Sequence, residues 1–132
     1  MIKKQFTLYL ENKPGALARV TNLLAEAKIN IEGISVSSSV DIGLVQIVVS
    51  NAVRTRQILT RKKIAFVTQD VVLVQLANQP GALARVVSKI AKLGININYV
   101  YATACTGGEN CRSVAIISAP NLRKVDDICK SL

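Results

Sequence analysis

The sequence has no histidine and no tryptophan, and only 4% of its residues are aromatic. Without histidine, neither a Cys-His nor a Ser-His catalytic pair is possible, and no nucleophile has a base at a credible position. Only 8 residues are acidic, against 17 that are basic. We therefore expect a protein that is not an enzyme, that has no catalytic residues and that needs no cofactor.

Cysteine is also scarce, with only Cys105, Cys111 and Cys129 in the chain. A zinc site needs about four ligands, so without histidine or a second cysteine pair we expect no metal site. The odd number argues against a disulfide framework. Cys105 and Cys111 flank a predicted hairpin turn at residues 106–110, across which they could meet as a redox pair. We expect instead two ordinary free thiols.

Long hydrophobic runs are absent, although 50% of the residues are hydrophobic. No run approaches the roughly 18 apolar residues of a membrane span. The first five residues lack the apolar region of a signal peptide. The composition suits one ordinary domain or two very small ones, and it predicts a cytoplasmic protein without membrane contacts.

An internal repeat is the strongest positive signal. Residues 12–20 read NKPGALARV and residues 78–86 read NQPGALARV, an offset of 66 positions that also relates residues 29–31 (INI) to residues 95–97 (INI). Two matches at one offset indicate a duplication. We place one repeat at residues 1–70 and the other at residues 71–132.

Each repeat has the pattern of a βαββαβ unit. Strands are predicted at residues 6–11, 29–36, 42–49 and 65–68 of the first repeat and at 71–77, 95–103 and 112–118 of the second. Helices are predicted after each Pro-Gly turn and at residues 52–63 and 122–130. Nothing after the last helix can serve as a fourth strand. The fold class is therefore α+β: two ferredoxin-like repeats with antiparallel sheets, helices on one face, and a second repeat that lacks its last strand.

The Asn-x-Pro-Gly turn is the best candidate for chemistry. It leads into a helix N-terminus, where free backbone N–H groups and the helix dipole attract carboxylates. Asn12 and Asn78 add an amide with two donors and one acceptor, able to meet both ends of a zwitterion. Asn30 and Asn96 begin the second strand of each repeat and carry another amide. The alternative is that the motif is only a stable turn, which asparagine itself satisfies.

These residues resemble ACT domains, small βαββαβ modules that sense amino acids. The resemblance rests on the segment ENKPGAL at residues 11–17, with KINI at 28–31, on the copy from residue 78, with GINI at 94–97, and on DIG at 41–43, which resembles stand-alone tandem ACT proteins. It implies an effector site between ACT domains. The residues that match the site are Asn12, Pro14, Gly15, Ala16, Leu17, Asn30, Asn78, Pro80, Gly81, Ala82, Leu83 and Asn96.

In the ACT domains of serine-inhibited dehydrogenases, one asparagine precedes the Pro-Gly turn and another starts the second strand of the neighbouring domain. Their pattern also has a histidine two residues before the first asparagine. Here Leu10 and Leu76 occupy those positions. This departure argues against serine and favours a ligand with an apolar side chain.

The resemblance implies a non-catalytic regulatory protein that binds a small ligand, an amino acid, where ACT domains meet. One alternative is a regulatory or assembly subunit of a partner enzyme, without an effector of its own. Another is an RNA-binding module, because the formal net charge is +9 and the RNA-recognition motif shares the βαββαβ order. That motif stacks bases on aromatic residues of its first and third strands, and residues 42–49 and 112–118 contain none.

A homodimer is also expected. The strand at residues 71–77 is apolar on both faces and carries neither a charge nor a proline. Without a fourth strand beside it, its edge is exposed and favours aggregation. Pairing with the first repeat or with a second chain would cover this edge. The resemblance also points to a dimer, since ACT domains commonly pair through their second strands.

Overall fold

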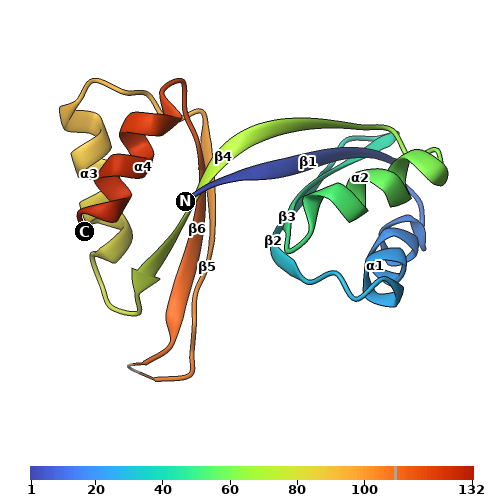
Figure 1. Cartoon of the computed structure of the whole chain (residues 1–132), viewed down its shortest axis with the longest axis horizontal. Coiled ribbons are helices and arrows are strands. Elements are labelled where there is room, and N and C mark those ends of the chain that lie inside the picture. Colours follow the sequence, from blue (N-terminus) through green and yellow to red (C-terminus); the bar gives the residue numbers. More distant parts are fainter. Residues whose placement is uncertain (109) are drawn as a thin grey trace. The chain divides into compact units, whose positions relative to one another are not determined.

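The computed structural model describes residues 1–108 and 110–132. The chain forms two compact units (Figure 1). The N-terminal unit is Lys4–Gln69, and the C-terminal unit combines Met1–Lys3 with Asp70–Leu132. Each unit has its own hydrophobic core. The first three residues thus belong to the same unit as the second repeat.

The N-terminal unit has the predicted ferredoxin-like topology. Its elements are β1 (Ile2–Glu11), α1 (Ala16–Glu26), β2 (Ile31–Ser38), β3 (Ile42–Val49), α2 (Ala52–Arg61) and the first residues of β4 (Phe66–Ala77). The strand order is β2-β3-β1-β4, with β3 antiparallel to both β1 and β2. The backbone amide of Tyr9 donates to the carbonyl oxygen of Ala65 at 3.1 Å, beside the start of β4.

The helices of this unit cover one face of its sheet (Figure 1). Residues of alternating positions in β1, Phe6 and Leu8, point into the core, because successive strand residues face opposite sides. They pack with Val20 and Leu24 of α1. Full burial of each such side chain contributes roughly 1.5–3 kcal/mol. Leu17, at the start of the same helix, is 37% exposed.

The C-terminal unit repeats this arrangement. Its elements are the second part of β4, then α3 (Ala82–Lys92), β5 (Tyr99–Thr103), β6 (Arg112–Ser118) and α4 (Leu122–Lys130). Strand β6 lies between β4 and β5 and is antiparallel to both. Its core includes Val74, Val86, Ile90 and Ile117. Gly94, which follows α3, has a φ of 70°, the left-handed conformation typical of a glycine just after a helix.

The bounds predicted for β3, β6 and α4 are those observed. Three other elements differ at their ends: β1 starts at Ile2 and not at residue 6, β2 spans Ile31–Ser38 and not residues 29–36, and α2 ends at Arg61 and not at residue 63. Two further predictions are wrong. Strand β5 starts at Tyr99, not at residue 95. The side chains of Ile95 and Ile97 do pack against the core, but only at Asn98 does the backbone reach β6, through a hydrogen bond of 2.8 Å to the carbonyl oxygen of Ser118. The predicted break between residues 68 and 71 does not exist, since β4 is one continuous strand.

The strand edge at residues 71–77 is covered by the first repeat, one of the two pairings predicted for it. Residues 131 and 132, which follow α4, form no strand, as predicted. However, Met1–Lys3 pack in the C-terminal unit. The backbone amide of Leu73 donates to the carbonyl oxygen of Met1 at 2.8 Å, and the Met1 ammonium donates to the carbonyl oxygen of Leu73 at 3.0 Å. The start of β1 therefore takes the place of the fourth strand.

Among the described helices, none combines the length and the apolar character needed to cross a membrane.

Candidate ligand-binding site

The two Asn-x-Pro-Gly segments fold into the same turn. In the first turn, the amide of Lys13 donates to the carbonyl oxygen of Glu11, and the amide of Ala16 donates to the carbonyl oxygen of Lys13. In the second turn, the amide of Gln79 donates to the carbonyl oxygen of Ala77, and the amide of Ala82 donates to the carbonyl oxygen of Gln79. Gly15 and Gly81 have φ angles of 87° and 89°, a left-handed conformation that glycine adopts without strain. Each glycine is the N-cap of its helix, and within the described residues no side chain caps either helix at that position. Backbone N–H groups at both helix starts thus remain available to an anion.

The motif asparagines bind the hairpin of their own unit. The Nδ2 atom of Asn12 donates to the carbonyl oxygens of Ser39, at 2.9 Å, and Val40, at 3.4 Å. The Nδ2 atom of Asn78 donates to the carbonyl oxygen of Gly108 at 3.4 Å. In both repeats the asparagine thus holds the Pro-Gly turn against the loop between the second and third strands. This contact supports the structural interpretation of the motif, and it also fixes the amide beside the helix start.

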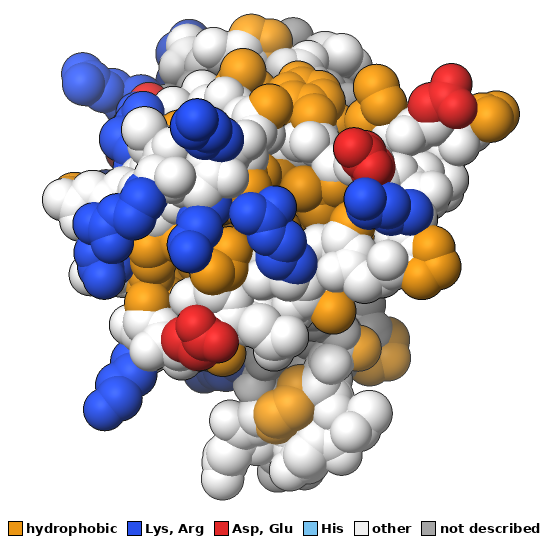
Figure 2. All heavy atoms as spheres, turned by 90° about the vertical axis from the view of Figure 1, so that its right-hand side faces the viewer, with side chains coloured by type: hydrophobic (Ala, Val, Ile, Leu, Met, Phe, Trp, Pro, Cys, Tyr) orange, Lys and Arg blue, Asp and Glu red, His pale blue; other side chains and the backbone are white. Residues whose placement is uncertain are grey.

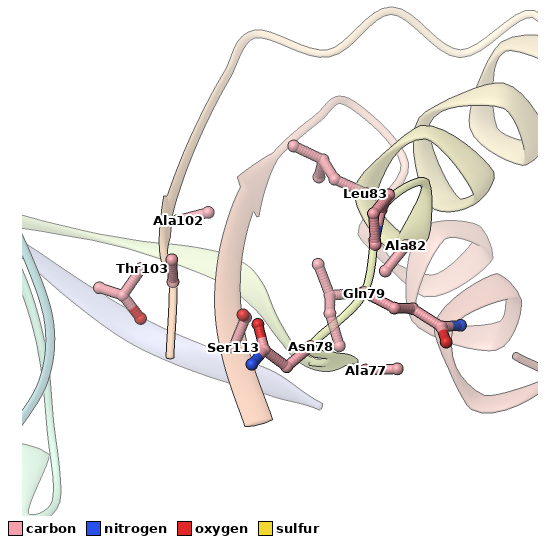
Figure 3. Close-up of a pocket in the computed structure, with 11 residues that line it drawn as sticks. Ala77, Asn78, Gln79, Ala82, Leu83, Ala102, Thr103 and Ser113 are labelled. Carbon is pink, nitrogen blue, oxygen red and sulfur yellow. The ribbon is translucent and has the colours of Figure 1, made fainter. Parts of the chain in front are cut away.

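A cavity of about 410 Å³ lies beside Asn78 in the C-terminal unit (Figure 3). Its walls come from the end of β4 and the Pro-Gly turn, the start of α3, the end of β5 and the start of β6. The lining residues are Leu76, Ala77, Asn78, Gln79, Pro80, Ala82, Leu83, Ala102, Thr103, Ala104 and Ser113. None of these side chains is charged. In Figure 3, Asn78 projects from the turn on the side of the strands that carry Thr103 and Ser113.

The lining of this cavity suits a small zwitterion with an uncharged side chain. The start of α3 offers backbone donors for a carboxylate, and the amide of Asn78 offers both a donor and an acceptor. The hydroxyls of Thr103 and Ser113 add polar partners. The remaining walls, such as Leu76 and Leu83, are apolar. Leu83 is 39% exposed, so its side chain remains accessible to a ligand.

The N-terminal unit has a cavity of about 370 Å³ with a different chemistry. Gly15 and Ala16 line it at the start of α1, together with the charged residues Glu11, Lys13, Arg19 and Lys63. The Nζ atom of Lys13 lies 2.9 Å from Oε2 of Glu11. This hydrogen bond, with the charge of Lys13, holds the pKa of Glu11 below its ordinary value. The two repeats therefore share a turn but present different surfaces beside it.

Figure 2 looks onto the α1 and α2 side of the N-terminal unit, where Lys and Arg side chains are spread among apolar ones.

Some of the residues predicted from the sequence line these cavities and others do not. Asn78, Pro80, Ala82 and Leu83 line the C-terminal cavity, and Gly15 and Ala16 line the N-terminal one. Asn12, Pro14, Leu17 and Gly81 belong to the same turns and helix starts without lining either cavity. Asn30 directly precedes β2, and Asn96 lies three residues before β5, so neither is inside a strand.

Within each unit the two kinds of asparagine are at opposite ends of the sheet. Glu11, beside Asn12, pairs with Ile42 at one end of β3, whereas Ile31, beside Asn30, pairs with Val49 at the other. At about 3.3 Å per strand residue, these ends are roughly 20 Å apart. Asn12 and Asn30 of one unit therefore cannot contact the same small ligand. The same holds for Asn78 and Asn96, since Ala77 pairs with Arg112 and Asn98 bonds to Ser118.

A disulfide joins Cys105 and Cys111 in the loop between β5 and β6. Their Cα atoms are 5.8 Å apart, within the usual range for disulfides, because the hairpin brings both ends of the loop together. The expectation of two free thiols is therefore wrong for this structure. Cys129 is free and half-buried, and its burial raises the pKa of its thiol. Glu109, in the same loop, lies outside the described residues.

Across residues 1–108 and 110–132, no three His, Cys, Asp or Glu side chains are grouped so that they could hold a metal ion.

The chain is similar to known proteins over almost its whole length. The sequence model of a family described as an ACT domain pair matches residues 1–126. The structure of protein BT0572 from Bacteroides thetaiotaomicron is similar with a TM-score of 0.87 and 31% identity, over 99% of this chain and 88% of that one. The regulatory subunit of aspartate kinase from Thermus thermophilus, in its ligand-free form, has a TM-score of 0.67 and 20% identity, over 99% and 94% of the two chains. The corresponding subunit from Thermus flavus has a TM-score of 0.57 and 17% identity, over 98% and 91%. No curated protein matches the sequence.

Proposed function

The chain belongs to the ACT domain pair family, and we propose that it is a non-catalytic regulatory protein that binds an amino acid. The observation that carries this proposal is the cavity beside Asn78, where a duplicated Pro-Gly turn, a helix start and an amide converge. Two structures with a similar fold are regulatory subunits of aspartate kinase. By analogy we propose that this chain acts on a partner enzyme, and from its composition we propose that it does so in the cytoplasm.

The preferred ligand is an amino acid with an aliphatic side chain. Its carboxylate would accept hydrogen bonds at the start of α3, where the helix dipole stabilises negative charge. Its ammonium group would donate to the Oδ1 atom of Asn78 or to a hydroxyl of Thr103 or Ser113. Its side chain would contact the apolar walls formed by Leu76 and Leu83. A charged side chain would find no charged partner among the lining residues.

The resemblance to ACT domains implies a site that combines the motif asparagine of one domain with the strand-start asparagine of a neighbouring domain. A second ACT domain is needed to complete such a site. Asn30 and Asn96 are too far from the motif asparagine of their own unit to share its ligand. The N-terminal unit also exposes apolar side chains on β2 and around its hairpin: Val36 is 50% exposed, Val40 is 90% exposed and Ile42 is 49% exposed. We propose that these surfaces pair in a homodimer. A stable particle of 14.2 kDa in light scattering, with and without amino acids, would contradict this.

The proposed function is tested by thermal unfolding in the presence of each of the twenty L-amino acids. A ligand that binds only the folded state increases the free energy of unfolding, by about 2.7 kcal/mol when its concentration is a hundred times Kd. The melting temperature rises as a result. We expect leucine, isoleucine, valine or methionine to give the largest shift. The D-enantiomer and the amide of the same amino acid are the matched controls, because they keep the side chain but change the contacts at the helix start. Equal melting temperatures in all twenty would rule out the proposal.

A further inference from the structure

The loop between β5 and β6 is built around its disulfide. The amide of Cys111 donates to the carbonyl oxygen of Gly108 at 3.2 Å, and Gly108 has a φ of 97°. Gly107 covers the sulfur atoms: a β-carbon at this position would lie 3.2 Å from Sγ of Cys111 and 3.6 Å from Sγ of Cys105. Both cysteines are nevertheless partly exposed. The disulfide therefore lies near the surface of the loop, and only a glycine fits against its sulfur atoms at position 107 without a close contact.

The same loop forms part of the candidate site. Gly108 accepts the hydrogen bond from Asn78, and Ala104, next to Cys105, lines the cavity with Thr103. Gly108 is three residues from each cysteine, and its carbonyl oxygen also accepts the hydrogen bond from the Cys111 amide. The disulfide loop thus supplies both the partner of Asn78 and part of one cavity wall.

The N-terminal unit shows what the disulfide replaces. There Asn12 donates to the carbonyl oxygen of Ser39 in a short turn at residues 39–41, which is closed by a bond of 2.9 Å from the Ser39 amide to the carbonyl oxygen of Ile42. The corresponding loop of the C-terminal unit, residues 104–111, is longer and contains Gly107 and Gly108. A longer loop loses more conformational entropy when it is ordered, and a crosslink lowers that cost. In the C-terminal unit the disulfide thus holds the ends of the loop together, as the short turn does in the N-terminal unit.

We propose that Cys105 and Cys111 form a reversible thiol–disulfide site, and that its oxidation state controls the contact between Asn78 and Gly108 and the shape of the adjoining cavity. Disulfides in the cytoplasm, where the sequence predicts this protein, are characteristically transient or regulatory. When the pair is reduced, the loop samples more conformations and Asn78 loses its fixed partner. When it is oxidised, the cavity wall is held in place, which favours binding by preorganisation.

The reaction is an exchange with a low-molecular-weight disulfide such as oxidised glutathione. One cysteine thiolate attacks a sulfur of the oxidant, forms a mixed disulfide and releases one glutathione thiol. The second cysteine then attacks the mixed disulfide, forms the bond between Cys105 and Cys111 and releases the second glutathione thiol. Two protein thiols are oxidised and one glutathione disulfide is reduced to two thiols, so electrons and protons balance. Excess reduced glutathione drives the reverse reaction.

The experiment uses the full chain labelled with ¹⁵N in glutathione buffers that range from reducing to oxidising. Thiol titration should count three reactive thiols under reducing conditions and one under oxidising conditions, reversibly. The side-chain amide resonances of Asn78 should shift or broaden on reduction, whereas those of Asn12 should stay unchanged. The Cys105→Ser/Cys111→Ser variant should resemble the reduced protein in every buffer. Cys129→Ser, the matched control, should respond as the parent does.

The proposal is overturned if the thiol count does not change across these buffers, or if the Asn78 resonances are the same in both states. It is also overturned if the double serine variant still responds to the buffer at Asn78. None of these measurements contains an amino acid, so their failure is distinct from a failure of the proposed function. Only the consequence for affinity rests on that function: reduction should weaken binding at the C-terminal cavity by at least about fivefold, a typical coupling between sites.

Discussion

Leu73 and Met1 exchange two backbone hydrogen bonds, of 2.8 and 3.0 Å, and so complete the sheet of the C-terminal unit. In the N-terminal unit the start of β4 occupies the corresponding place. The second repeat needs no fourth strand of its own, because the first residues of β1 supply the missing neighbour. The apolar strand that contains Leu73 is thereby protected within a single chain.

Removal of Met1–Lys3 should destabilise the C-terminal unit. It deletes two backbone hydrogen bonds, each contributing about 1 kcal/mol, and uncovers an apolar strand edge. We expect a loss of roughly 2–3 kcal/mol in the free energy of unfolding measured in urea, together with concentration-dependent aggregation. Removal of the exposed Leu132 at the other end of the chain is the control. Equal stability of both truncated chains would show that the edge is not protected in this way.

Asp126 should make stability depend on acidic pH. The Met1 ammonium and Lys130 lie beside its carboxylate and hold its pKa below the ordinary value, although burial opposes this. A carboxyl whose pKa is lowered by folding stabilises the protein above its unfolded pKa, about 3.9, and this contribution disappears as the pH falls through the folded pKa.

Urea unfolding between neutral and acidic pH tests this dependence. Asp126→Asn should be less stable than the parent at pH 7, and the difference should shrink toward pH 2. The exposed neighbour in the same helix, Asp127→Asn, is the control and should follow the parent. A constant difference between Asp126→Asn and the parent over this range would exclude an ionic role for Asp126.

The left-handed glycines of the two motif turns should resist substitution. A β-carbon at Gly81 would meet nothing within 4 Å, so the cost of Gly81→Ala is backbone strain alone, about 1–2 kcal/mol. Gly15→Ala should behave alike. Gly43→Ala is the matched control, because the φ of Gly43 is not positive. A β-carbon there would lie 3.8 Å from the carbonyl oxygen of Leu10, an ordinary van der Waals contact. In thermal unfolding, Gly81→Ala and Gly15→Ala should have lower melting temperatures than the parent, and Gly43→Ala should not.

Periodicity and turn chemistry were sufficient to predict most of the fold. The duplicated motif identified the repeats, and alternating apolar residues placed β3 and β6 correctly. The start of β5 was not predictable in the same way, since Ile95 and Ile97 alternate like strand residues and pack in the core without pairing. The role of Met1–Lys3 was equally hidden, because it depends on pairing with Leu73, far away in the sequence.

The candidate site was predictable on one side only. Asn78, Pro80, Ala82 and Leu83 belong to a recognisable motif, and they do line the cavity. Ala102, Thr103 and Ser113 form the opposite wall, but nothing in their own sequence marks them. They reach the cavity because β5 and β6 pair in a particular register. In a hairpin the register depends on the turn type and the loop length, and the sequence of the eight-residue loop at 104–111 has no recognisable turn type. The disulfide was missed because the thiol count and expected compartment outweighed the hairpin geometry.

The most direct test of amino-acid binding beside Asn78 is calorimetric titration of the parent and its variants with the amino acid that gives the largest thermal shift. Asn78→Ala should weaken binding by about 1–2 kcal/mol, roughly 5–30-fold, since it removes a hydrogen bond to a charged group. Asn22→Ala, on the exposed surface of α1, should bind as the parent does. An Asn12→Ala/Asn78→Ala double variant that binds the amino acid as tightly as the parent would contradict the assignment.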